Sequence, residues 1–195
     1  MEIFQSPFLL VFSNRSVYMN ILTGRNTPTF AKDTVYRFMK MIQINWIRFT
    51  TILSRRIIKE AIVLLDSKER ANVLIIDDSM FERNCSKMVE LLAKVYDHAK
   101  HSYKFGFCMI TLGWSDGSTF LSVNSILLST ENKKNRINEA KSVANRTVDY
   151  KRRSLSLKKG AHAMLQLFKN AKKADIPTNY VLFDNWFFLQ APSIP

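Results

Sequence analysis

Two apolar runs of this sequence each end in aspartate. The run 73–76 leads into Asp77 and Asp78, and the run 180–183 leads into Asp184. Short continuous runs of β-branched and other apolar residues are typical of strands that are buried on both faces. If the two strands lie side by side and parallel, their aspartates emerge at the same carboxyl edge, where open α/β sheets bind ligands.

Neighbouring carboxylates of this kind are suited to binding a metal ion. They repel each other and stay ionised together only where a cation neutralises them. Mg²⁺ binds one or two carboxylates together with water and substrate phosphates, and a pair of such ions can assist phosphoryl transfer. Aspartates are also common after strands as turn residues or helix caps, so the spacing alone leaves both interpretations open.

The composition indicates an anionic partner. The 195 residues include 29 Lys and Arg against 16 Asp and Glu, a net charge of +13, and such a surplus attracts polyanions. Nucleic acid is the first candidate, and an anionic membrane surface is the second. Most of the surplus lies in 131–173, where the sequence has 13 Lys and Arg and three acids.

Basic side chains in that segment are candidates for contacts with DNA phosphates. The cluster at 151–153 is either a phosphate clamp or the solvated start of a helix, and the sequence leaves both open. The candidate residues are Lys133, Lys134, Arg136, Lys151, Arg152, Arg153, Lys158 and Lys159.

The sequence does not support several other classes of protein. No run approaches the roughly 18 apolar residues of a membrane helix, and the N-terminus makes a poor signal peptide. The two cysteines form no CxxC pair, which fits a reducing compartment. No glycine-rich phosphate loop occurs. We therefore expect a cytoplasmic protein without a membrane partner.

The N-terminal part of the chain indicates helices. Residues 1–30 contain scattered turn formers and predict an irregular lead-in. Apolar residues then recur at three- and four-residue steps over 34–65, which predicts one helix, or two helices with a bend near Thr50 and Thr51. We expect 31–70 to form a helical N-terminal segment.

The remaining residues, 71–195, predict an α/β domain. The runs 105–114 and 119–128 flank an Asp-Gly turn, which is a strong hairpin signal. Helical spacing returns over 157–173, and Pro177 ends that helix. A strand, a hairpin, a helix and a last strand in this order predict a mixed sheet of three antiparallel strands and one parallel strand, with helices on its faces.

Two further features have ordinary explanations. His98 and His101 stand near Asp97, but no cysteine or converging acid accompanies them, so a solvated or DNA-facing pair is favoured over a metal site. Trp114 is expected in the core of the hairpin rather than as a platform on which bases stack.

Three blocks of the sequence, in this order, resemble those of the bacterial insertion-sequence transposases of the "insertion sequence four" type. They are VLIIDDS at 73–79, GWSDG at 113–117 and VLFDNWF at 181–187. The stretches 90–101 and 133–136 are also similar to that group. The resemblance covers roughly residues 30–190.

The resemblance implies a ribonuclease-H-like fold and a transposase of the two-aspartates-and-a-glutamate (DDE) class. Such enzymes hydrolyse the phosphodiester at transposon ends and join the freed 3′-hydroxyl to target DNA, using Mg²⁺ or Mn²⁺. Their first metal-binding aspartate stands in an Asp-any-Thr or Asp-any-Ser pattern, which falls here on Asp77 with Ser79. Asp78 is the alternative if the register is off by one residue. The second aspartate matches Asp184, followed by Asn185 where the family often has serine.

The family completes its metal site with a glutamate on a later helix, within a Tyr-any-any-Glu signature. None of the residues 185–195 is acidic, and Glu90, Glu131 and Glu139 precede Asp184. We therefore expect a C-terminally truncated transposase with an incomplete catalytic domain at 71–195, inactive or nearly so alone.

The expected partners are DNA and either a second copy of the chain or an intact transposase, with the bacterial nucleoid as the location of the bound form. Exposed apolar surface around Trp186, Phe187 and Phe188 would favour self-association. The alternative function is a truncated DNA-binding protein that interferes with transposition without catalysis.

Overall fold

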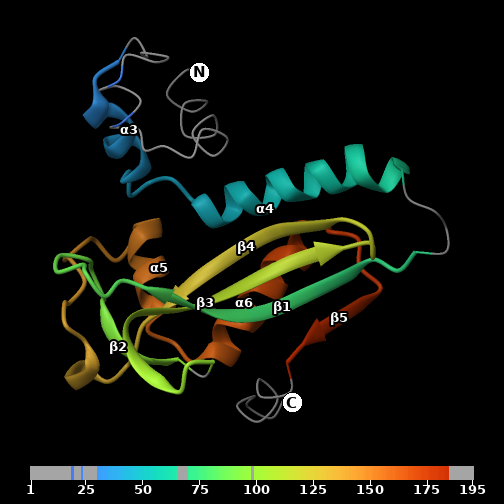
Figure 1. Cartoon of the computed structure of the whole chain (residues 1–195). Helices are drawn as coiled ribbons and strands as arrows, with labels where there is room; N and C mark the ends of the chain where they lie inside the picture. The colour runs from blue at the N-terminus through green and yellow to red at the C-terminus, as the bar shows by residue number, and fades with distance from the viewer. Residues whose placement is uncertain (1–18, 20–22, 24–29, 66–69, 98, 185–195) are drawn as a thin grey trace. The chain divides into compact units, whose positions relative to one another are not determined.

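The computed structural model describes residues 19, 23, 30–65, 70–97 and 99–184 (Figure 1). The chain divides into two compact units, Met1–Ile44 and Asn45–Pro195. Most of the lead-in predicted for 1–30 and the aromatic cluster at 186–188 lie outside the described residues. None of the helices that the structure describes is long and apolar enough to cross a bilayer.

The helical stripe predicted over 34–65 is interrupted earlier than expected. Helix α3 (Lys32–Met39) belongs to the first unit, and α4 (Trp46–Ile57) begins the second. The side chain of Asn45 accepts the Arg48 N–H at 3.0 Å, which caps the start of α4. The predicted bend near Thr50 and Thr51 is therefore wrong, because an asparagine cap before residue 46 already separates the two helices.

Helix α4 continues through both threonines. Their hydroxyls donate to the carbonyls of Trp46 and Ile47, at 3.0 and 2.7 Å, so neither side chain opens the helix. The helix passes into a π-helical turn, Ile58–Ile62, and a short 3₁₀ turn, Val63–Leu65.

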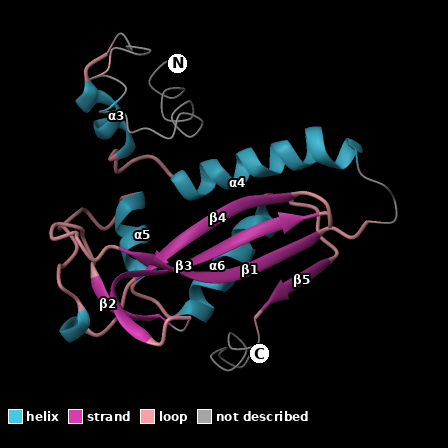
Figure 2. Cartoon of the chain, viewed as in Figure 1, coloured by secondary structure: helices cyan, strands magenta, loops and turns pink. Residues whose placement is uncertain are grey.

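The second unit is built on a mixed five-stranded sheet (Figure 2). Its strands are β1 (Val73–Glu82), β2 (Ala93–Asp97), β3 (Ser102–Ser115), β4 (Phe120–Leu128) and β5 (Tyr180–Phe183). Strand β3 pairs antiparallel with β1, β2 and β4, and β5 pairs parallel with β1. The mixed α/β sheet is confirmed, and it is compatible with a ribonuclease-H-like fold.

Strand β2 is the one strand of the described sheet that the sequence analysis did not predict. Its five residues, AKVYD, carry two charges and lie in a stretch that resembles a polar loop. They form a strand because β3 begins at Ser102, before the predicted start at 105. The first residues of β3 provide backbone N–H and C=O groups with which β2 pairs. A partner strand supplied by tertiary structure thus outweighs the weak local preference.

The predicted hairpin is confirmed. The Asp116 carboxylate accepts the N–H groups of Ser118 and Thr119 at 2.9 and 2.6 Å, and Gly117 has φ 92°. A glycine adopts this left-handed backbone without the cost that a Cβ would bring. Trp114 is fully buried and donates its indole N–H to the Pro177 carbonyl at 2.8 Å, which confirms it as a core residue.

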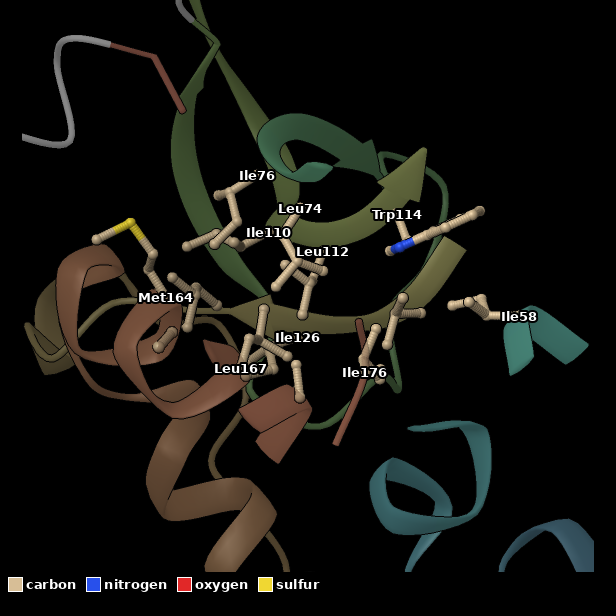
Figure 3. Close-up of a cluster of buried hydrophobic side chains, with 14 residues drawn as sticks. Ile58, Leu74, Ile76, Ile110, Leu112, Trp114, Ile126, Met164, Leu167 and Ile176 are labelled. Carbon is tan, nitrogen blue, oxygen red and sulfur yellow. The ribbon is translucent and has the colours of Figure 1, made fainter. Parts of the chain in front are cut away.

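Two helices follow the hairpin, α5 (Val148–Ser156) and α6 (Gly160–Lys173). Figure 3 shows Met164 and Leu167 of α6 facing the apolar side chains of the sheet. This main core contains Leu74, Ile76, Ile110, Leu112, Trp114 and Ile126 from the strands. A second cluster is formed around Leu91, Leu92 and Phe107.

Candidate metal centre at the β1–β5 edge

The two aspartate blocks lie on neighbouring strands. Strands β1 and β5 pair in parallel from Val73 with Tyr180 to Ile76 with Phe183 (Figure 1). Asp77 and Asp184 each come one residue after the last pair, at corresponding positions. Since paired strands lie about 4.8 Å apart, the register brings the two carboxylates to the same short stretch of the sheet.

The two aspartates differ in how the backbone holds them. Strand β1 continues past Asp77 to Glu82, so Asp77 lies within a strand and opposite Thr111 of β3. Asp184 directly follows the end of β5. Both residues are exposed, so their carboxylate oxygens are open to an ion from solution.

Asp78 points to the other face of the sheet. It follows Leu74 and Ile76 in the alternation of β1, on the face that carries the main core, and it is half-buried. The Cys108 thiol lies 3.7 Å from the Asp78 carboxylate. Burial, reinforced by the negative charge of Asp78, raises the pKa of Cys108 to about 12. Asp78 therefore lies beside a protonated thiol, away from the face of Asp77.

The donors at this edge fit a hard divalent cation. Carboxylate oxygens are the ligands that Mg²⁺ and Mn²⁺ prefer, and one or two of them suffice when water and phosphate complete the shell. Within the described residues, no group of three or more His, Cys, Asp or Glu converges on one point. The pair Asp77 and Asp184 could thus supply part of a metal shell.

The histidines near Asp97 are a weaker candidate. Asp97 is buried, and its carboxylate accepts the N–H groups of Ala99 and Lys100 at 3.0 and 3.1 Å, so it caps the turn between β2 and β3. His101 is exposed, and His98 lies outside the described residues. The favoured solvated or DNA-facing pair stays a prediction.

The basic candidates separate into two groups. The first group has exposed side chains that are open to an anion: Lys133, Lys134, Lys151, Arg152, Lys158 and Lys159. Of these, Arg152 lies 4.0 Å from Asp149 and keeps 44% of its side chain exposed. Their contacts with DNA stay a prediction.

The second group, Arg136 and Arg153, is engaged inside the protein. Arg136 is 5% exposed, and it donates to Glu139 at 3.1 Å and to the Thr130 carbonyl at 3.2 Å. Arg153 donates to Glu90 at 2.7 Å and to Asp149 at 2.6 Å.

Arg153 and Glu90 shift each other's pKa. The hydrogen bond that Arg153 donates to Glu90, with a further contribution from the bond to Asp149, raises the pKa of Arg153. The same bond from Arg153 lowers the pKa of Glu90. The spacing of Arg153 from Asp149 is an i,i+4 pair that the sequence displays, but the contact with Glu90 has no local signal.

The chain is similar to a known protein family. A family model described as "DDE superfamily endonuclease" matches residues 8–192. Neither the curated proteins nor the solved structures contain a match. The family description implies a nuclease or transposase that acts on DNA, and such enzymes generally use divalent metal ions. The match spans almost the whole chain and includes both aspartate blocks, so this protein belongs to the DDE superfamily endonucleases.

Proposed function

We propose that this chain is a DNA transposase of the cut-and-paste kind, similar to the "insertion sequence four" group, with Asp77 and Asp184 as metal ligands. The observation that carries the proposal is the parallel pairing of β1 with β5, in which both aspartates stand one residue beyond the last pair. Asp77 is favoured over Asp78 because it shares its face of β1 with solvent rather than with the main core.

In this function the two carboxylates bind and orient Mg²⁺ or Mn²⁺. The bound metal ions would supply charge for activating the attacking oxygen and for stabilising the leaving oxygen of a phosphodiester. The protein's own contribution is to hold two carboxylates at the paired strands β1 and β5, where exposure leaves room for phosphates and water. Thr111, opposite Asp77 on β3, belongs to the same scaffold.

The exposed lysines would contact the phosphates of the DNA backbone. Point charges on flexible stems suit phosphate contacts that carry no sequence information. Arg136 and Arg153 support this surface indirectly, since their guanidiniums keep the loops and α5 in position through ion pairs.

The pair Asp77 and Asp184 alone makes an incomplete metal shell. Within the described residues, no third acidic or histidine side chain joins the two aspartates. We therefore expect these residues to bind metal weakly and to leave supercoiled plasmid intact. Metal-dependent nicking that is abolished by Asp184→Ala would contradict this expectation.

The decisive experiment measures Mn²⁺ binding in two ways. Isothermal titration calorimetry gives the affinity, and electron paramagnetic resonance gives the concentration of the free ion. We expect Asp77→Asn and Asp184→Asn each to weaken binding about tenfold or more, since each removes a ligand oxygen. Asp78→Asn is the matched control because it makes the same change one residue away, on the opposite face of β1. Its Mn²⁺ affinity should equal that of the wild-type chain.

Two outcomes of that titration would overturn the assignment. If Asp78→Asn weakens Mn²⁺ binding and Asp77→Asn does not, the metal lies on the other face of β1. If none of the three variants changes the affinity, the aspartates serve the fold as turn or edge residues. Circular dichroism and thermal unfolding show whether each variant retains its structure.

A second function, DNA binding without catalysis, is favoured by the exposed lysines. A chain that binds transposon DNA, or that pairs with an intact transposase, would interfere with transposition. It predicts DNA affinity that falls steeply with salt and that is unchanged by Asp77→Ala. Loss of DNA affinity in Asp77→Ala, without unfolding, would contradict this second function.

A further inference from the structure

The hairpin of β2 and β3 carries three exposed aromatic rings. Tyr103 is 62% exposed, Phe105 is 42% exposed and Tyr96 is 38% exposed. Tyr96 pairs with Tyr103 and Lys94 pairs with Phe105 across the two strands, so these four side chains share one face of the hairpin. The two tyrosine rings contact edge to face, with centroids 5.1 Å apart.

A lysine lies beside these rings. The Lys94 ammonium lies 5.2 Å from the centre of the Tyr103 ring, within the range of a cation–π interaction. A surface hollow of about 320 Å³ is lined by Lys94, Lys104, Tyr103, Phe105 and Asn84. An exposed aromatic ring can stack with a base, and a neighbouring lysine ammonium can contact a phosphate of the same strand.

The acids of this region do not cancel that positive charge. Segment 82–105 contains three acids, Glu82, Glu90 and Asp97. Glu82 pairs with Lys100 at 2.5 Å, Glu90 is paired with Arg153, and Asp97 is buried in the turn. None of these three acids is paired with Lys94, so the ammonium beside the rings is available to a phosphate.

Hydrogen bonds hold the aromatic face in place. The side chain of Asn84 accepts the Phe105 N–H at 3.0 Å, and the Arg83 N–H donates to the Phe105 carbonyl at 2.7 Å. Strand β3 then runs without interruption from these rings to Thr111, opposite Asp77. A preordered platform loses little conformational freedom when a ligand binds.

We propose that this hairpin face binds an unpaired stretch of DNA, whose bases stack on Tyr103 and Phe105 while Lys94 contacts its phosphates. Stacking is available only to bases that are not paired in a duplex, and it tolerates any base sequence. The inference rests on DNA as the ligand, as the proposed function does, and it does not depend on metal chemistry at Asp77 and Asp184. The hairpin face would allow a DDE endonuclease to bind a DNA strand that has separated from its complement.

The test is fluorescence anisotropy with the full chain in EDTA, so that no metal site contributes. The probes are a labelled single strand of about 15 nucleotides, within the site sizes of single-strand binders, and the matching duplex. We expect Tyr103→Ala to weaken single-strand binding about tenfold and to leave duplex binding unchanged. Tyr103→Phe keeps the ring and should keep the affinity.

Phe120→Ala is the matched control, because Phe120 of β4 is 60% exposed and lies outside both the hairpin of β2 and β3 and the strands β1 and β5. It should bind both probes like the wild-type chain. A strand containing 2-aminopurine reports stacking directly, since its emission is quenched by a stacked ring. We expect quenching by the wild-type chain and by Tyr103→Phe, and a loss of quenching in Tyr103→Ala.

Several results would overturn the proposal. The first is that the wild-type chain binds the duplex but not the single strand. The second is that the Tyr103→Ala/Phe105→Ala double variant quenches 2-aminopurine as strongly as the wild-type chain. If Tyr103→Ala unfolds the hairpin, Lys94→Gln serves as the test variant instead. We expect Lys94→Gln to decrease the slope of log affinity against log salt concentration by about one for the single strand. Metal-binding results at Asp77 leave all of these outcomes unaffected.

Discussion

Arg153 joins two carboxylates from separate parts of the chain. It bonds to Glu90, just before β2, and to Asp149, in the first turn of α5. The side chains of Arg153, Glu90 and Asp149 are 20%, 29% and 21% exposed. Partly buried pairs of this kind are screened less by salt than surface pairs. Arg153 is therefore primarily a structural residue, although its sequence neighbours made it a candidate for phosphate binding.

Replacing Arg153 should measurably destabilise the second unit. We expect Arg153→Ala to lower the free energy of unfolding by roughly 1–3 kcal/mol, because Glu90 and Asp149 lose a charged donor. Arg152→Ala removes the neighbouring guanidinium, which is more exposed, and should cost at most about 0.5 kcal/mol. Urea denaturation measures both variants. Equal losses would show that the ion pairs of Arg153 add nothing.

The same ion pair predicts a pH dependence of stability. The pKa of Glu90 is lowered by its bond from Arg153, so its contribution is fully present above the ordinary value for glutamate of about 4.3. It is lost as the pH falls through the lowered folded-state pKa. We expect wild-type chain to be more stable than Glu90→Gln at neutral pH, and the two stabilities to converge in acid. Parallel stability curves down to about pH 3 would contradict this assignment.

At the scale of elements, Asn124 fastens α4 to the edge of the sheet. Its side-chain amide donates to the Ile47 carbonyl and to the Thr51 hydroxyl, both at 2.8 Å. Ser54 donates to the Ser122 carbonyl at 3.3 Å, one turn along the helix. These polar contacts are buried, so their loss leaves groups of α4 without partners.

Removal of this contact should loosen α4 before the rest of the unit unfolds. We expect Asn124→Ala to lower stability by about 1–3 kcal/mol and to speed amide hydrogen exchange in α4 more than in β1. Ser125→Ala, at the exposed neighbouring position, is the control and should leave the exchange unchanged. Uniform acceleration across the sheet in Asn124→Ala would mean that α4 is not held locally by this residue.

Element boundaries also show where local signals are sufficient. The hairpin was predicted correctly because Asp116 and Gly117 form their turn from residues within a few positions of each other. Strand β2 was missed because its pairing with β3 outweighs a charged and weakly β-forming sequence. The helix break at Asn45 was missed because an apolar stripe continues across it, while the cap itself is a single polar residue.

At the scale of the whole molecule, a net charge of +13 is compatible with a compact fold because most of the lysines lie on the outside. Most basic residues in segment 131–173 are exposed to solvent, whereas the side chain of Arg136 is only 5% exposed. We therefore expect only the exposed lysines and arginines, and not the whole net charge of +13, to contribute to DNA binding.

Salt dependence separates these two kinds of basic residue. Each phosphate that is neutralised contributes about 0.9 to the slope of log affinity against log salt. We expect Lys158→Gln/Lys159→Gln to lower the slope for duplex DNA by about two, and Arg136→Gln to leave it unchanged. Arg136→Gln should instead reduce stability. If Arg136→Gln lowers the slope and the lysine pair does not, the division into exposed and engaged residues is wrong.

By itself, the sequence determined the strand runs before Asp77 and Asp184, the hairpin and the helix before Pro177, because apolar period and turn chemistry act between near neighbours. Tertiary structure alone decided that β5 pairs directly with β1 and in which register, that β2 is a strand and that Arg136 and Arg153 are engaged. Each of these depends on which distant segments contact each other when the core is buried. Local periodicity predicts a parallel strand but carries no information on its neighbour, so only the fold places Asp77 and Asp184 at corresponding positions of paired strands.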